Sequence, residues 1–325
     1  MAKPKVFVAR IIPDKGLDLV RDFCEIDLWT HELPPDRAEM LRHVQGVNGI
    51  LSLLTDRIDG EVMDAAGRSL KVISNHAVGF DNVDVNAATA RSIPVGNTPE
   101  VLTDATADFA FTLLMSAGRR VLEADRYVRD GKWKTWGPML LLGSDMRDAT
   151  LGLVGFGRIG KAMARRAMGF DMRVIYYDPN EKEAHPELHA TRVDFETLLA
   201  QADFISLHTP LNPDTRHLID SEALSKMKSS AVLVNTSRGP VVDMDALYEA
   251  LKEKRIFAAG LDVTDPEPLP ADHKLLTLDN VTIMPHIASA SKQTRDKMSW
   301  MAAQNLIAGL KGERLPNCVN PQVYK

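Results

Sequence analysis

Three ionisable side chains, far apart in the sequence, have the types needed to reduce a 2-oxo acid. Arg238 follows an apolar run and precedes Gly239-Pro240, where its planar guanidinium could bind an α-keto carboxylate through two hydrogen bonds. His286 lies just beyond the last predicted strand, and an imidazole, which titrates near neutrality, could give a proton to a carbonyl oxygen. Glu267 lies between two prolines and could pair with that imidazole to fix its orientation.

Each of these residues also has an interpretation without chemistry. Arg238 could be a surface arginine in a salt bridge. His286 is one of nine histidines, most of which are expected on the surface. Glu267 could be an ordinary loop acid, with Asp265 as a nearby competitor for the same partner. Taken singly, none of the three residues decides between these alternatives.

A glycine-rich turn indicates a second kind of chemistry, the binding of a dinucleotide. Residues 155–160 read Gly-Phe-Gly-Arg-Ile-Gly and lie between an apolar run and a predicted helix. Gly155 permits the tight turn, Gly157 lets the backbone approach a pyrophosphate, and Gly160 lets the helix pack on the strand. The positive end of the helix would face the phosphates. The alternative is an ordinary glycine turn.

Asp178 bears on which dinucleotide would bind. It ends the next apolar run, about 20 residues beyond the glycine turn, where a carboxylate would hydrogen-bond a ribose 2′-hydroxyl. The same carboxylate would repel a 2′-phosphate, so NAD is expected and NADP is disfavoured. The alternative is a solvated turn residue before Pro179.

Two further strand ends carry groups that could bind small ligands. Asp262 ends a predicted strand and could accept a hydrogen bond from a nicotinamide amide; the alternative is a cap or turn residue. The backbone N–H groups of Val78 and Gly79 follow another predicted strand and could bind a carboxylate. The alternative there is a plain turn into the next helix.

The elements that must position these residues alternate along the chain. Residues 1 to about 100 contain short apolar runs between helical patterns, which predicts a small parallel α/β unit. A connecting helix is predicted from Thr103 or Asp104 to Val128, passing Arg119-Arg120 without a break. Beyond it, apolar runs alternate with helical patterns, at 151–154, 174–177, 202–208, 231–235, 258–263 and 281–284. This predicts a doubly wound sheet that binds ligands at the carboxyl ends of its strands.

Length, charge and cysteine content limit the classes of protein to which the chain can belong. The 325 residues suffice for two domains. A net charge of −5 offers no basic surface for nucleic acid or membrane, and no apolar run approaches the roughly 18 residues of a membrane span. Cys24 and Cys318 provide neither a disulfide framework nor metal-ligand spacing, so no metal is expected. Because no signal sequence is evident, a cytoplasmic location is expected.

Residues 131–147 form an irregular apolar excursion that includes Trp133 and Trp136. Exposed aromatic, Met and Leu side chains often mark an interface, so a homodimer contact is expected here. The alternative is packing within one chain.

Together and in this order, the motifs resemble those of the D-isomer-specific 2-hydroxyacid dehydrogenase family over nearly the whole chain. They are 78–84 (Val-Gly-Phe-Asp-Asn-Val-Asp), 97–99 (Asn-Thr-Pro), the glycine turn, 208–210 (His-Thr-Pro), 235–239 (Asn-Thr-Ser-Arg-Gly), 262–268 (Asp-Val-Thr-Asp-Pro-Glu-Pro) and Pro285-His286. Within the family, residues 260–269 and 285–290 look most like those of glyoxylate/hydroxypyruvate reductases.

The resemblance implies a doubly wound parallel-sheet (Rossmann) nucleotide domain, residues 103–290, inserted in a smaller flavodoxin-like α/β substrate domain, residues 1–102 and 291–325. It implies that Arg238, Glu267 and His286 are catalytic. The cofactor-binding residues that it implies are Thr106, Gly155, Gly157, Arg158, Ile159, Gly160, Asp178, Thr209, Thr236, Ser237, Asp262, His286 and Ala288. The implied substrate-binding residues are Val78, Gly79, Arg238 and His286. Relatives that prefer NADP place an arginine where this chain has Asp178.

The expected activity is NADH-dependent reduction of glyoxylate, hydroxypyruvate or a similar small 2-oxo acid to the D-2-hydroxy acid. The alternatives are another D-2-hydroxyacid dehydrogenase, a phosphite or formate dehydrogenase, or an NADH-sensing binding protein with little turnover. Four apolar residues are candidates for setting the size of the substrate pocket: Leu54, Trp136, Met139 and Leu140.

Overall fold

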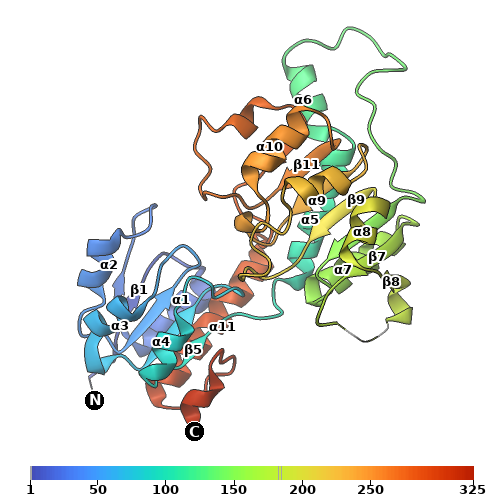
Figure 1. Ribbon diagram of the computed structural model, residues 1–325. Helices are drawn as coiled ribbons and strands as arrows, with labels where there is room; N and C mark the ends of the chain where they lie inside the picture. The colour runs from blue at the N-terminus through green and yellow to red at the C-terminus, as the bar shows by residue number, and fades with distance from the viewer. Residues whose placement is uncertain (1, 182, 184) are drawn as a thin grey trace. The chain divides into compact units, whose positions relative to one another are not determined.

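The structure, a computed structural model, describes residues 2–181, 183 and 185–325 and divides the chain into two compact units. Unit 1 consists of Met1–Leu102 and Ala290–Lys325, and unit 2 of Thr103–Ser289. The chain therefore leaves unit 1, completes unit 2 and then returns to unit 1, as the colours of Figure 1 show.

Unit 1 is built on a five-stranded sheet in which all neighbouring strands are parallel. Its strands are β1 (Lys5–Val8), β2 (Glu25–Leu28), β3 (Gly49–Ser52), β4 (Val72–Asn75) and β5 (Val95–Gly96). Their order is β2-β1-β3-β4-β5, which is the order of the flavodoxin-like fold that the family resemblance implies. Strands β3 and β4 lie inside the sheet and are buried along their whole length, which explains their nearly continuous apolar character.

Helices cover both faces of this sheet. They are α1 (Asp14–Phe23), α2 (Arg37–His43), α3 (Gly60–Ala66), α4 (Val85–Ala90) and α11 (Lys292–Lys311), with short 3₁₀ turns η1 (Gly67–Ser69) and η5 (Pro321–Tyr324). One core joins α1 and α11 to the sheet, and the other joins α2, α3 and α4. The contact of α1 with α11 requires a glycine, because a Cβ on Gly16 would lie 2.1 Å from the carbonyl oxygen of Ser299.

Unit 2 contains a seven-stranded sheet, again parallel throughout. Its strands are β6 (Thr150–Val154), β7 (Arg173–Tyr177), β8 (Ala190–Arg192), β9 (Phe204–Leu207), β10 (Val232–Asn235), β11 (Ala258–Leu261) and β12 (Val281–Ile283). The order β12-β11-β10-β9-β6-β7-β8 reverses direction at β6, so the predicted doubly wound fold is confirmed. In such sheets the ligand crevice lies at the carboxyl ends of the strands beside the reversal, here β6 and β9.

Helices also cover both faces of the second sheet. They are α5 (Thr103–Gly118), α6 (Val121–Arg129), α7 (Arg158–Met168), α8 (Phe195–Gln201), α9 (Ser221–Lys226) and α10 (Met244–Lys252), with 3₁₀ turns η2 (Pro186–Leu188), η3 (Gly239–Val241) and η4 (Lys274–Thr277). Helices α5 and α7 share one core, and α8, α9 and α10 share the other. Asp194, Asp220 and Asp243 cap the last three helices by accepting hydrogen bonds from their first-turn amides, which fixes where each helix begins.

The prediction of one unbroken helix through Arg119-Arg120 is wrong. Helix α5 ends at Gly118 and α6 begins at Val121, because Arg120 has a φ of 56° in the left-handed region. The carbonyl oxygen of Gly118 accepts a hydrogen bond from the amide of Ser144, 2.8 Å away. A contact with a segment more than 20 residues downstream therefore replaces the hydrogen bond that would have continued the helix.

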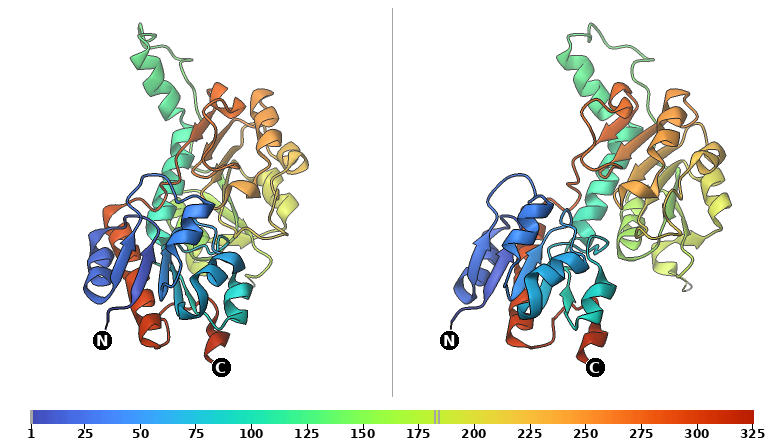
Figure 2. Two further views of the ribbon diagram at one scale, coloured as in Figure 1. Left: turned by 90° about the vertical axis from the view of Figure 1, so that its left-hand side faces the viewer. Right: turned by 60° about the vertical axis from the view of Figure 1, so that its left-hand side comes forward.

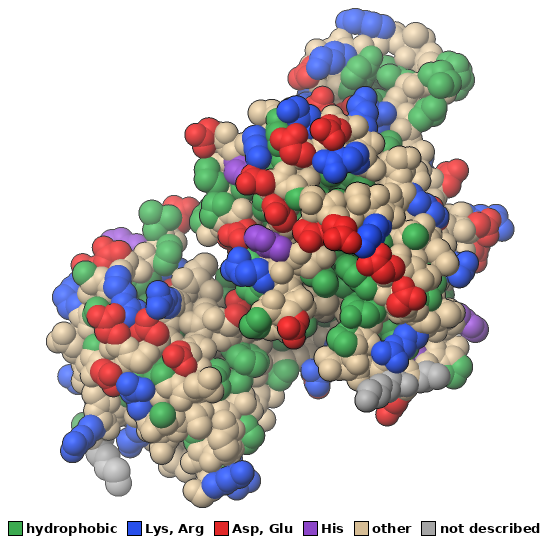
Figure 3. Space-filling model, in the orientation of Figure 1, with side chains coloured by type: hydrophobic (Ala, Val, Ile, Leu, Met, Phe, Trp, Pro, Cys, Tyr) green, Lys and Arg blue, Asp and Glu red, His purple; other side chains and the backbone are tan. Residues whose placement is uncertain are grey.

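Beyond α6, the excursion at 131–147 projects away from the body of unit 2 in Figures 1 and 2. Trp133, Trp136 and Met139 are 58%, 78% and 77% exposed, so they do not pack into a core of their own chain. Figure 3 shows green apolar side chains gathered at the end of this projecting segment. Elsewhere on that face, acidic and basic side chains are interspersed. Among the described residues, no helix combines the length and apolar character needed to cross a membrane.

Candidate active site

His286 and Glu267 lie in contact on two neighbouring loops of unit 2. Glu267 belongs to the loop after β11, and His286 follows β12 by three residues. The Nδ1 atom of His286 is 2.6 Å from Oε1 of Glu267, and both side chains are partly exposed. His286 also has a φ of 56°, a backbone conformation that side chains other than glycine rarely adopt and that clusters at functional sites. The structure thus brings this predicted pair together, with Nε2 of His286 facing away from Glu267.

Asp262 fixes the backbone on either side of His286. Its main-chain oxygen accepts from the amide of His286 at 2.9 Å, and its carboxylate oxygens accept from the amides of Ile287 and Ala288, both at 2.8 Å. The side chain is almost wholly buried, and this burial raises the pKa of Asp262, although the two backbone hydrogen bonds oppose the rise. Sequence reasoning missed this positioning role, because the partner amides lie 25 and 26 residues further along the chain.

Arg238 lies on a loop that the buried Asn235 holds in shape. The Asn235 side-chain oxygen accepts from the amide and the hydroxyl of Ser237, and its nitrogen donates to the carbonyl of Arg238 at 2.8 Å. Next to it, a Cβ on Gly239 would lie 1.9 Å from the carbonyl oxygen of Thr264, so this loop packs directly on the loop that carries Glu267. Since β10, β11 and β12 are adjacent strands, all three predicted catalytic residues come from one edge of one sheet.

The glycine turn has the geometry that the sequence predicts. Gly155 has a φ of 93°, and a Cβ there would lie 2.7 Å from the carbonyl group of His208. A Cβ on Gly160 would lie 2.3 Å from the carbonyl oxygen of Gly155, so both residues must be glycine for packing reasons. Gly157 differs, because nothing lies within 4 Å of the place its Cβ would take. Gly157 occupies the N-cap position of α7, but it has no side chain to accept hydrogen bonds from the amides of the first turn. The space in front of these amides is therefore open.

Two buried hydroxyl groups lie at neighbouring strand ends without a partner. Thr209 follows β9, and Thr236 follows β10, which is paired with β9. Within the described part of the chain, Oγ1 of each makes no hydrogen bond. A buried hydroxyl without a partner is costly, so a ligand that satisfies both groups would be bound favourably. The open glycine turn and these hydroxyls together fit a dinucleotide.

Replacing Gly157 with alanine is expected to weaken NADH binding about tenfold or more while leaving the melting temperature unchanged. The Gly157 backbone has a φ of −73°, which alanine adopts without strain, but its methyl group would occupy the space that a pyrophosphate needs. NADH affinity would be measured by fluorescence titration. Gly169→Ala, at the other end of α7, is the matched control, since its Cβ makes only an ordinary contact at 3.4 Å. If Gly157→Ala binds NADH as tightly as the unsubstituted protein, the glycine turn does not form part of the nucleotide site.

Asp178, which is partly exposed, links the glycine turn to the turn that follows β7. One carboxylate oxygen accepts from the amide of Phe156 at 2.8 Å, inside the glycine turn, and the other accepts from the amides of Asn180 and Glu181. The carboxylate therefore helps to close the turn around which the nucleotide would bind. Its contact with a ribose stays a prediction.

The other predicted cofactor residues occupy different environments. Thr106 is buried in α5, Ala288 is buried beside Asp262, and Ile159 is partly buried against the core shared by α5 and α7. Arg158 is the first residue of α7. Their contact with a cofactor stays a prediction. Across the described residues, no group of three or more His, Cys, Asp or Glu side chains is arranged to hold a metal ion.

In unit 1, the predicted carboxylate-binding loop follows β4. Val78 and Gly79 are both partly exposed. Within the described residues, neither backbone N–H donates a hydrogen bond. Two consecutive amides that are left unpaired in an ordered loop are available to an anion.

The buried His76 lies two residues before Val78. Because of this histidine, we expect the protein to lose stability at low pH. The histidine side chain is 4% exposed, and burial, together with the charge of Arg295, lowers the pKa of His76 to about 4. The unfolded chain, with a pKa of about 6.5, takes up this proton first as the pH falls. Stability should therefore decrease by up to about 3 kcal/mol between pH 6.5 and pH 4.

Urea unfolding at a series of pH values measures this effect, since His76→Gln should lack that part of the pH dependence. The exposed His31 of the same unit provides the control, His31→Gln, which should keep it. Equal pH dependence in His76→Gln and the unsubstituted protein would contradict the assignment.

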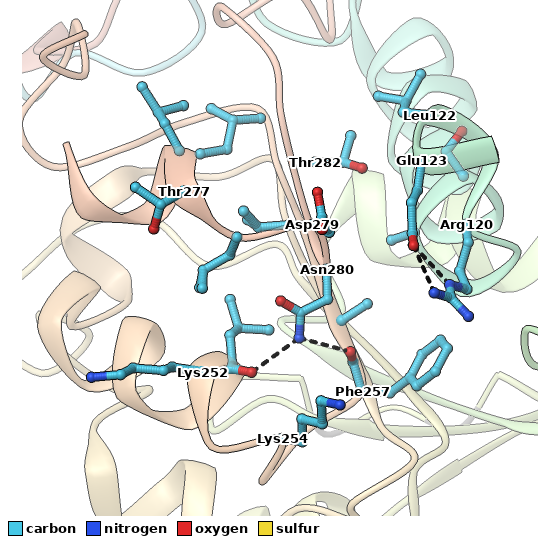
Figure 4. A pocket seen from close by; sticks show the side chains of 18 of the residues that line it. Arg120, Leu122, Glu123, Lys252, Lys254, Phe257, Thr277, Asp279, Asn280 and Thr282 are labelled. Atoms are coloured by element: carbon cyan, nitrogen blue, oxygen red, sulfur yellow. Dashed lines mark hydrogen bonds and ion pairs between the residues drawn. The ribbon is translucent and has the colours of Figure 1, made fainter. Parts of the chain in front are cut away.

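A cavity of about 640 Å³ lies elsewhere in unit 2 and contains none of the predicted site residues. It is lined by the ends of α5, α6 and α10, by η4 and by the edge strand β12. Figure 4 shows the ion pair of Arg120 with Glu123 on one side and the hydrogen bonds of Asn280 on the other. The cavity therefore does not belong to the candidate active site.

Comparison with known proteins agrees with the geometry. The family model described as D-isomer specific 2-hydroxyacid dehydrogenase, NAD binding domain, matches residues 111–288. The chain is 54% identical to a glyoxylate reductase of Korarchaeum cryptofilum, over 99% of this chain and 98% of that protein. A crystal structure of a Thermus thermophilus protein has a TM-score of 0.91 and 48% identity, covering 97% of this chain and 99% of its own.

A third relative is the NADPH-dependent glyoxylate/hydroxypyruvate reductase of Sinorhizobium meliloti, solved in complex with NADP and malonate. It has a TM-score of 0.84 and 31% identity, and 98% of each chain is covered. The predicted resemblance is confirmed over the full length: the chain belongs to the D-isomer specific 2-hydroxyacid dehydrogenase family.

Proposed function

We propose that the protein reduces glyoxylate, hydroxypyruvate or a similar small 2-oxo acid to the D-2-hydroxy acid with a nicotinamide cofactor. The observation that carries the proposal is the contact of His286 with Glu267 at 2.6 Å, on loops that adjoin the Arg238 loop. Relatives named glyoxylate reductase, up to 54% identical over nearly the whole chain, support the choice of substrate class.

Each side chain has one role in the proposed reaction. The Arg238 guanidinium binds the substrate carboxylate and polarises the neighbouring carbonyl group. Protonated His286 gives the proton on Nε2 to the carbonyl oxygen, and Glu267, at Nδ1, holds the ring in place and stabilises its positive charge. In unit 1, the N–H groups of Val78 and Gly79 are available to bind a carboxylate. A reduced nicotinamide, when bound, supplies the hydride.

The preferred cofactor is NAD rather than NADP, because the carboxylate of Asp178 would repel the 2′-phosphate group of NADP. We expect kcat/KM for NADH to exceed that for NADPH by about tenfold or more. Asp178→Asn keeps an acceptor for the amide of Phe156 but removes the charge, so it should narrow this ratio. Steady-state assays with both cofactors measure it. A ratio near one in the unsubstituted protein, or one that Asp178→Asn leaves unaltered, would contradict the role of this carboxylate.

The decisive experiment follows the loss of NADH absorbance with glyoxylate, hydroxypyruvate and pyruvate, and the gain of NADH from NAD with phosphite, formate and D-lactate. We expect turnover with glyoxylate and hydroxypyruvate. Tight NADH binding without oxidation by any 2-oxo acid would instead favour an NADH-sensing binding protein. Turnover with phosphite or formate alone would show that the protein is a phosphite or formate dehydrogenase.

We further propose that the protein is a homodimer joined through the excursion at 131–147. Its exposed Trp133, Trp136 and Met139 form an apolar surface of a kind that marks interfaces. Light scattering coupled to size-exclusion chromatography should give twice the 35.9 kDa chain mass. The double substitution Trp136→Ser with Met139→Ser should shift the protein towards the monomer, and a monomeric unsubstituted protein would refute the proposal.

A further inference from the structure

Three successive carbonyl groups in the loop after β4 are held by hydrogen bonds within unit 1. The carbonyl oxygen of Ala77 accepts from the backbone amide of Thr98 at 2.9 Å. That of Val78 accepts from Nδ2 of Asn97 at 2.8 Å, and that of Gly79 accepts from Nδ2 of Asn75 at 3.0 Å. Two of these three donors are asparagine side chains, and both lie at the carboxyl edge of the sheet, where β4 and β5 end.

Holding a carbonyl oxygen also fixes the next N–H group. The atoms of a peptide unit are coplanar, and in a trans unit the C=O and N–H bonds point in opposite directions. Thr98 therefore orients the N–H of Val78, Asn97 orients that of Gly79, and Asn75 orients that of Phe80. Each N–H is turned away from the group that binds the carbonyl, and within the described residues none of these three amides donates a hydrogen bond.

Both asparagines are themselves held in place. Asn75 is fully buried, and its side-chain oxygen accepts from the hydroxyl of Ser52 at 3.0 Å. Its nitrogen also donates to the side-chain oxygen of Asn82 at 3.0 Å, and Asn82 donates in turn to the carbonyl of Leu53. The backbone of Asn97 accepts from Nδ2 of Asn305 at 2.8 Å. The connected hydrogen bonds of Asn75 restrict the rotation of its amide plane, and the contact with Asn305 fixes the backbone from which the Asn97 side chain extends.

We infer that Asn97 and Asn75 are positioning residues that hold the peptide units of this loop so that the N–H groups of Gly79 and Phe80 stay available to bind a carboxylate. This inference rests on the proposed function and deepens it, because it adds the N–H of Phe80 as a third donor beside those of Val78 and Gly79. An amide side chain suits the task, since it combines a donor for the carbonyl with an acceptor that neighbouring groups can anchor.

Asn97→Ala in the full-length protein tests the inference. Without the donor to the carbonyl of Val78, the Gly79 peptide unit can rotate, and a hydrogen bond to a charged carboxylate is weakened. The KM for glyoxylate and the inhibition constant of oxamate, a carboxylate that is not reduced, should rise together by about 10- to 100-fold. The value of kcat should change far less, and the dissociation constant of NADH should stay the same.

Asn48→Ala is the matched control. Asn48 belongs to the same unit, and its amide likewise bridges backbone groups, donating to the carbonyl of Ser69 at 3.3 Å and accepting from the amide of Lys5 at 2.9 Å. It precedes β3 and so lies at the amino end of the strands. This variant should alter stability alone, with both substrate constants unchanged.

The outcomes separate this inference from the proposed function. A lower melting temperature in Asn97→Ala with unchanged KM and oxamate inhibition would overturn the positioning role and leave a structural one. If Asn97→Ala does not fold, Asn97→Ser, which fills more of the same space, is measured in its place. If the unsubstituted protein reduces no 2-oxo acid, the proposed function fails, and oxamate binding to the NADH complex then decides the positioning role.

Discussion

Replacing His286 with alanine is expected to lower kcat for glyoxylate by a factor on the order of 10²–10⁴, with little change in NADH affinity. The reason is that the carbonyl oxygen must gain a proton as it gains the hydride, and His286 is the group whose Nε2 is left available by the contact of Nδ1 with Glu267. Single-turnover measurements with saturating NADH would isolate this step from product release. Glu267→Gln keeps the shape of the side chain and should cause a smaller loss.

His217→Ala is the control for this substitution. His217 is also a histidine of unit 2 with a left-handed backbone, φ 52°, but its side chain is exposed. Any effect that comes from relaxing such a backbone, rather than from losing the proton donor, would appear in both variants. Near-normal turnover in His286→Ala would show that another group donates the proton.

The second large effect is expected from Arg238→Lys, which should reduce kcat/KM for glyoxylate by about 10²–10³ although the positive charge remains. Lysine presents a single ammonium group and cannot form the two parallel hydrogen bonds by which a guanidinium orients a carboxylate. The loss should therefore appear in both kcat and KM, measured in steady state at fixed, saturating NADH.

Arg216→Lys provides the comparison, since Arg216 is an exposed arginine of the same unit whose guanidinium lies 3.9 Å from Asp265. It should behave like the unsubstituted protein. If Arg238→Lys keeps full kcat/KM, the two-hydrogen-bond geometry is not used, and the carboxylate is bound elsewhere.

The sequence predicted the parts of the site that depend on local pattern. Gly155, Gly157 and Gly160 lie at a strand-to-helix turn, which has a known geometry, and the apolar runs before Arg238 and Asp262 are strands of a parallel sheet. The rule that ligands bind at the carboxyl ends of such strands then placed the candidates on one edge. These inferences need only short stretches of chain and one general rule of topology.

What could not be predicted depends on contacts between distant residues. The sequence offered both Asp265 and Glu267 as partners for His286, and only the fold decides: Glu267 reaches Nδ1, whereas Asp265 lies near Arg216. The break at Arg120 depends on an amide from Ser144. The edge strand β8, with the sequence Ala-Thr-Arg, has too short and too polar a pattern to be recognised. Asn97 lies in the Asn-Thr-Pro motif that the sequence analysis identified. Its hydrogen bond, however, joins it to the carbonyl of Val78, 19 residues earlier in the chain.

The path of the chain through the two units has a consequence for synthesis on the ribosome. One core of unit 1 packs Val6 and Val8 against Ala302 and Leu306 of α11, so its first hundred residues emerge long before the helix that completes them. Unit 2 is continuous and can close as soon as residue 289 has left the exit tunnel. Until α11 has also left the tunnel, the nascent chain carries an uncovered apolar sheet face, and such a face favours aggregation.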